Sequence, residues 1–135
     1  MNTIEVLTKA RDLISNKDNW CVDVLHRRHQ GRLQHCVAGA INQVCHGTAV
    51  WHYDGNGQNE KALGVLHKVC IRLFGDETIK SLFGEVTVAK HSAPAIAVNN
   101  KLGHDAIILA LDTAIGDYPD HAPKEPGAKE LTCVR

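Results

Sequence analysis

The chain of 135 residues has no excess of either charge, no long apolar run and few aromatic side chains. Its fifteen Lys and Arg residues are balanced by fifteen Asp and Glu residues, which argues against non-specific binding of nucleic acid through net basic charge. No apolar run approaches the roughly 18 residues that a membrane span needs, and the first residues do not resemble a signal peptide. We therefore expect a cytoplasmic protein that does not contact a membrane.

Disulfide and cofactor signatures are also missing. The five cysteines are odd in number and none forms a Cys-x-x-Cys pair, so we expect free thiols in a reducing compartment. No phosphate-binding loop is present, and Gly55-x-Gly57 lacks the third glycine of a dinucleotide fingerprint. His26-x-x-His29 with His35 or Cys36 offers zinc-type ligands, but no second close pair completes a tetrahedral set. The sequence therefore predicts neither a cofactor nor a metal.

Apolar residues at helical spacing dominate the rest of the chain. This spacing predicts helices at about 3–14, 36–44, 59–74, 76–83 and 105–115. Thr3, Asn59 and either His104 or Asp105 are the expected N-caps, and Gly75 is an expected helix terminator. We predict a mainly α-helical, single compact domain of about five helices with little or no sheet, covering residues 1–118. The Pro-containing segment 119–135 is expected to be a loosely ordered tail.

The densest group of functional residue types is the segment 26–36, which carries three arginines and three histidines. We expect it to be a basic loop that leads into a helix starting near Cys36. Free N–H groups at a helix start, together with bidentate arginine donors, favour a phosphate or carboxylate ligand. The candidate ligand-binding residues in this segment are Arg27, Arg28, His29, Arg32 and His35. The alternative is a solvated basic loop balanced by acidic residues elsewhere.

A catalytic interpretation of the same segment uses Cys36 as a nucleophile. A helix start lowers the pKa of a thiol, and His35, His91 or His104 would act as the base, with Asn99 or Asn100 orienting it. The small apolar residues after Cys36 instead favour a cysteine that is turned into the core. We therefore predict no catalytic residue, and keep Cys36, His35 and Asn99 as the alternative set.

Two aromatic residues, Trp51 and Tyr53, stand together in a Gly- and Asn-rich segment. Such a pair in a loop is able to stack on a ligand or on a partner surface. We therefore add Trp51 and Tyr53 to the candidate ligand-binding residues. The alternative is a loop that folds back over a small core.

Several short motifs resemble those of a small uncharacterised domain family of phage and actinobacterial genomes. They are Trp20-Cys21, the Cys36-Val37-Ala38-Gly39-Ala40 helix start, and Val98-Asn99-Asn100, which stands where the family has Trp-Asn-Asp before a final helix. The resemblance covers roughly residues 3–116 and is weakest over 46–92. It implies a shared fold and a phage or bacterial origin, but no activity.

From these observations we hypothesise a non-enzymatic accessory protein that binds an anionic small molecule or a host protein. If the ligand is a nucleotide signal and the gene belongs to a phage, the protein would act in the host cytoplasm as a counter-defence factor. The alternatives are a thiol-dependent hydrolase or transferase that uses Cys36, and a structural interaction module that forms a homodimer.

Overall fold

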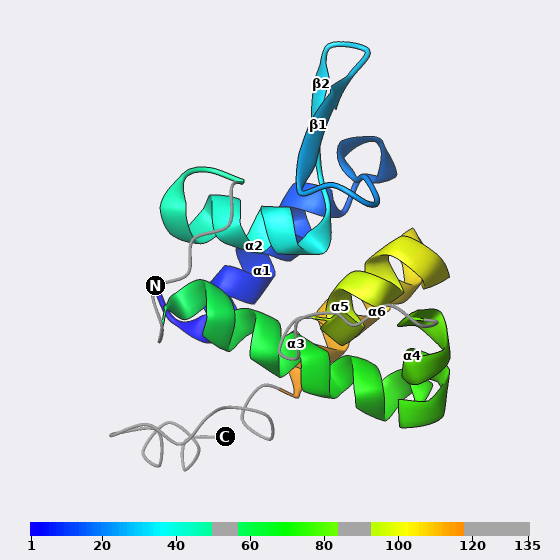
Figure 1. The fold of residues 1–135 in the computed structure, drawn as a ribbon. Helices are drawn as coiled ribbons and strands as arrows, with labels where there is room; N and C mark the ends of the chain where they lie inside the picture. The colour runs from blue at the N-terminus through cyan, green and yellow to red at the C-terminus, as the bar shows by residue number, and fades with distance from the viewer. Residues whose placement is uncertain (50–56, 84–92, 118–135) are drawn as a thin grey trace.

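A computed structural model describes residues 1–49, 57–83 and 93–117 (Figure 1). The described residues form six α-helices, a 3-10 turn, a π-helical turn and one two-stranded sheet. In chain order these are α1 (Thr3–Ile14), η1 (Lys17–Asn19), β1 (His26–His29), β2 (Arg32–His35), α2 (Val37–His46), α3 (Gln58–Phe74), α4 (Asp76–Phe83), α5 (Ala93–Ala97), η2 (Val98–Leu102) and α6 (His104–Gly116). The mainly α-helical fold class is confirmed.

The hydrophobic core lies where α1, α2, α3 and α6 meet. α1 packs against each of the other three helices, and α3 also packs against α2 and α6. The largest fully buried side chains come from all four helices and include Leu7, Ile41, Leu66 and Leu111. In α2 every residue from Val37 to Asn42 is buried, so this small-residue helix occupies the central position that its composition favours.

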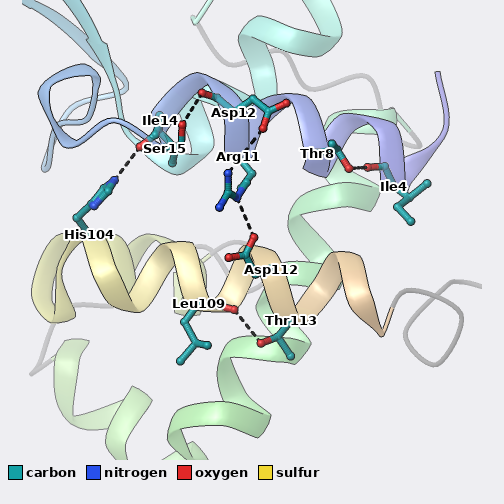
Figure 2. A network of polar contacts seen from close by, with 10 residues as sticks. All are labelled: Ile4, Thr8, Arg11, Asp12, Ile14, Ser15, His104, Leu109, Asp112 and Thr113. Carbon is teal, nitrogen blue, oxygen red and sulfur yellow. Dashed lines mark hydrogen bonds and ion pairs between the residues drawn. The ribbon is translucent and has the colours of Figure 1, made fainter.

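Polar contacts join α1 to α6 outside the apolar core (Figure 2). Nε of Arg11 donates to Oδ1 of Asp112 at 2.8 Å, which raises the already high pKa of Arg11 through hydrogen bonding and charge attraction. Nε2 of His104 lies 2.7 Å from the carbonyl oxygen of Ile14, and a carbonyl only accepts, so this nitrogen carries the hydrogen. These contacts fix α6 along the length of α1.

Segment 26–35 is a β-hairpin, which corrects the prediction of a basic loop. β1 and β2 pair antiparallel, with His26 opposite His35 and His29 opposite Arg32. Gln30 and Gly31 both have positive φ (52° and 77°), as a two-residue hairpin turn requires. In Figure 1 the hairpin projects from the helical body at the top of the view.

The predicted N-caps lie at the first or second residue of a helix instead of before it. The N-cap of α1 is Asn2, whose side chain accepts from the N–H of Glu5, while Thr3 is the first helical residue. α3 follows Gly57 and α6 follows Gly103, so Asn59, His104 and Asp105 are helical and do not cap. Gly75 ends α3 with φ 87°, as predicted.

The segment before α6 holds a feature that the sequence did not predict. α5 runs directly into η2, whose five residues form a π-helical turn. Such turns are rare and often mark a local functional or packing constraint. Here the turn places Asn99 in the core and Asn100 at its edge.

Several predictions fall on residues outside the described ranges, among them Trp51, Tyr53, His91 and the tail 119–135. The division into a domain over 1–118 and a tail stays a prediction. Within the described ranges, no helix combines the length and the apolar character that crossing a membrane requires.

Candidate functional site

Asn99 lies at a buried junction between three segments that are distant in sequence. Its Oδ1 accepts from Nε1 of Trp20 at 2.7 Å and from the N–H of Val37 at 3.0 Å. Its Nδ2 donates to the carbonyl of Cys21 at 3.1 Å and to Oδ1 of Asn100 at 2.9 Å. An amide side chain offers two donors and two acceptor positions, so Asn99 uses its full hydrogen-bonding capacity within the protein.

The start of α2 is closed to ligands, which corrects the predicted position of an anion site. The N–H of Val37 is bonded to Asn99, and the N–H of Gly39 donates to Sγ of Cys36 at 3.4 Å. The carbonyl of Leu25 accepts from the N–H of Cys36 and lies directly over Gly39, where a methyl group would overlap it. The helix start is therefore buried and its donors are already used.

The same contacts remove the support for a Cys-His-Asn catalytic arrangement. Cys36 is 5% exposed, and burial raises its pKa above the usual value, which favours the unreactive thiol. Asn99 has no remaining donor or acceptor with which to orient a histidine. The buried, structural interpretation of Cys36 is therefore the one that the geometry favours.

The hairpin divides the predicted basic cluster between two faces, because side chains alternate along a strand. On one face, Nε of Arg27 donates to Oε1 of Gln34 at 2.6 Å, and Arg32 donates to Oδ1 of Asn19 at 3.1 Å. Gln34 in turn donates to the carbonyl of Asp18 in η1. We call this side, which consists of Arg27, His29, Arg32 and Gln34, the braced face. Arg27 and Arg32 hold the hairpin against the preceding segment.

The opposite face of the hairpin borders a pocket of about 430 Å³, which we call the hairpin pocket. Its lining comes from the hairpin and from the C-terminal end of α2: His26, Arg27, Arg28, Leu33, His35, Gln43, Gly47, Thr48 and Ala49. By the strand register, His26, Arg28, Leu33 and His35 share this face. Pockets that bind small molecules fall in the same range of volume, roughly 300–1,000 Å³.

His35 is the most unusual side chain of the hairpin pocket. It is 3% exposed, and neither ring nitrogen has a hydrogen-bond partner in the described part of the chain, although the Gln43 amide lies near the ring. Burial lowers the pKa of His35; Gln43 opposes this effect and His26 adds to it. Buried polar atoms usually find a partner, so an orphaned imidazole beside a pocket indicates a position for a ligand or a water.

The structure does not bring the remaining candidate residues together in one site. His26 and His29 lie three residues apart in one strand and so point to opposite faces, which separates the proposed zinc ligands. In the described ranges no group of three His, Cys, Asp or Glu side chains is placed to hold a metal. The four described cysteines are free thiols. His104 packs against the Trp20 ring, with ring centroids 5.2 Å apart.

Sequence reasoning missed the α2 side of the hairpin pocket, which Gln43, Thr48 and Ala49 provide. Gln43 lies in the C-terminal part of α2, and Thr48 and Ala49 follow the helix, so only the tertiary fold brings these residues to the hairpin. The two residues Gln30-Gly31, which form the hairpin turn, were the one local signal for the strands that present the pocket face. The homodimer stays a prediction.

The residues that carried the family resemblance meet at the Asn99 junction. Asn99 contacts Trp20 and the start of α2, where Cys36 and Gly39 lie. A comparison with protein-family models matches residues 1–117 to a family of unknown function, DUF6197. Searches of curated proteins and of solved structures gave no match. Because the matched region spans most of its length, the chain belongs to the DUF6197 family.

Proposed function

We propose that this protein is a non-enzymatic binding protein that holds an anionic small molecule in the hairpin pocket. The observation that carries the proposal is the Arg28 guanidinium in the same pocket as the orphaned, buried His35. In the described part of the chain Arg28 has no hydrogen bond or ion pair, unlike Arg27 and Arg32. A free guanidinium is a bidentate donor for a carboxylate or phosphate, and the unsatisfied ring nitrogens of His35 offer polar contacts to the rest of the ligand.

The geometry refines the set of binding residues. Arg28 and His35 bind the ligand and His26 borders the site, whereas Arg27 and Arg32 position the hairpin. His29 lies on the braced face, away from the pocket. A host protein remains the alternative ligand, and it would meet the exposed hairpin from outside.

The test is a titration of the ¹⁵N-labelled protein with inorganic phosphate and with citrate, followed by NMR. We expect saturable shifts at the amides of 26–28 and 47–49, their loss in Arg28→Ala, and their retention in Arg72→Ala. The second variant removes the same charge from a half-exposed ion pair of α3 that does not line the pocket, and it is the matched control. If neither anion gives saturable shifts, or if Arg72→Ala abolishes them while Arg28→Ala does not, the proposed site is wrong.

A further inference from the structure

The hairpin pocket changes character from its rim to its floor. At the rim, His26 and Arg28 are exposed. At the floor, His35 and Ala49 are 3% and 5% exposed. A ligand that fills the pocket therefore meets a cationic, hydrated end and an uncharged, buried end.

The floor is unsuited to an anion. The C-terminal end of α2, with Gly47 in the left-handed conformation, forms one wall of the pocket, and a helix C-terminus carries partial negative charge. Burial keeps His35 in its neutral form, so it does not offset that potential. The anionic group of a ligand consequently belongs at Arg28, and the floor favours an uncharged group with an N–H donor.

Arg28 and His35 lie at different positions along the same hairpin face. Arg28 is opposite Leu33 in the hairpin, and His35 lies two residues further along β2. Two strand residues span about 7 Å of backbone. A ligand with a polar group at each end would therefore contact Arg28 at the rim and His35 at the floor together.

The floor has the composition of a site for a flat heterocycle. His35 presents one ring donor and one ring acceptor, the Gln43 amide lies beside it, and Ala49 supplies apolar surface, with Leu33 above it towards the rim. At the rim, Arg28 is the single arginine without a side-chain partner in the described chain, which matches one phosphate rather than a triphosphate. We propose that the hairpin pocket binds a nucleoside monophosphate, with its phosphate on Arg28 and its base edge against His35 and Gln43.

This inference rests on the proposed function and is tested with ligands that separate the two. Full-length protein is titrated by calorimetry with the four common ribonucleoside monophosphates, with ribose 5-phosphate, which lacks the base, and with uridine, which lacks the phosphate. We expect at least one nucleotide to bind ten or more times more tightly than ribose 5-phosphate. Arg28→Ala should weaken the binding of the nucleotide and of ribose 5-phosphate, and Arg72→Ala, which lies outside the pocket, should weaken neither.

The floor is tested by His35→Leu and Gln43→Ala, with far-UV circular dichroism as the check of folding. Both variants should remove the advantage of the nucleotide and leave the affinity for ribose 5-phosphate unchanged. If all nucleotides bind only as tightly as ribose 5-phosphate and depend on Arg28, the anion site stands and the nucleotide assignment is overturned. If neither the nucleotides nor ribose 5-phosphate bind, or if uridine binds as tightly as the nucleotides, the proposed anion site is wrong as well. The ligand series decides the question even if a floor variant fails to fold.

Discussion

Replacing Asn99 should destabilise the protein far more than replacing its neighbour Asn100. Asn99→Ala removes four hydrogen bonds and leaves the buried N–H of Val37 and the carbonyl of Cys21 without their partner. Each unsatisfied buried group costs about 1–3 kcal/mol. The partly buried indole N–H of Trp20 loses its acceptor as well. For the three groups together we expect the free energy of unfolding to fall by about 3–5 kcal/mol.

The control is Asn100→Ala. Oδ1 of Asn100 accepts from the exposed N–H of Asp23 and from Nδ2 of Asn99, so its removal frees one group that water reaches and one of the two donor hydrogens of Asn99. A loss of about 1–2 kcal/mol follows. Urea unfolding at pH 7, followed by far-UV circular dichroism, gives both free energies.

A third variant separates hydrogen bonding from packing. Asn99→Leu keeps a side chain of similar size but has no polar atom to meet Trp20, Val37 or Cys21. If the hydrogen bonds matter, this variant loses most of the stability that Asn99→Ala loses. A Leu variant as stable as the wild type would refute the reasoning, since the site would then need only volume.

Three further predictions concern other buried positions. Gly39→Ala should lower the free energy of unfolding by about 3 kcal/mol, because the added methyl group overlaps a backbone carbonyl. Gly64→Ala adds a methyl group in open space within α3 and should raise the free energy of unfolding by about 0.5–1 kcal/mol in the same urea assay. Equal effects of the two substitutions would contradict the predicted clash. Iodoacetamide should label the half-buried Cys45 in the folded protein and Cys36 only after unfolding, as peptide mass mapping would show; rapid labelling of native Cys36 would contradict its burial. Because the folded pKa of His35 is lowered, the unfolded chain binds its proton near pH 6.5 and the folded chain does not, so stability falls as the pH drops below 6.5. His35→Gln should reduce that slope by up to about 1.4 kcal/mol per pH unit, and an unchanged slope between pH 5 and 6.5 would refute the assignment.

Periodicity predicted the helices well but not the hairpin, for a physical reason. Helices α1, α3 and α6 bury one apolar stripe each, and that stripe is visible at helical spacing. β1 has four exposed residues, so no apolar alternation marks it as a strand. The two-residue turn at Gln30-Gly31 was its only local signal.

The candidate site was partly accessible from sequence and partly not. The arginines and His35 stand out by composition, but which of them is free depends on Gln34 and Asn19, whose side chains occupy Arg27 and Arg32. Residue type alone also favoured a ligand at the start of α2. The structure shows instead that the side chain of Asn99, 62 residues further along, fills that position at Val37.

The Asn99 junction also bears on the order in which the chain folds. It joins residues separated by 62 to 79 positions, so α2 has no partner for its first N–H until nearly the whole helical domain has been synthesised. Contacts between residues so far apart in sequence require the closure of a long loop, so they form late in folding. The N-terminal half, with α1, the hairpin and α2, therefore leaves the ribosome with the Cys36 cap of α2 but with the N–H of Val37 unpaired, and that N–H gains its partner only when η2 arrives.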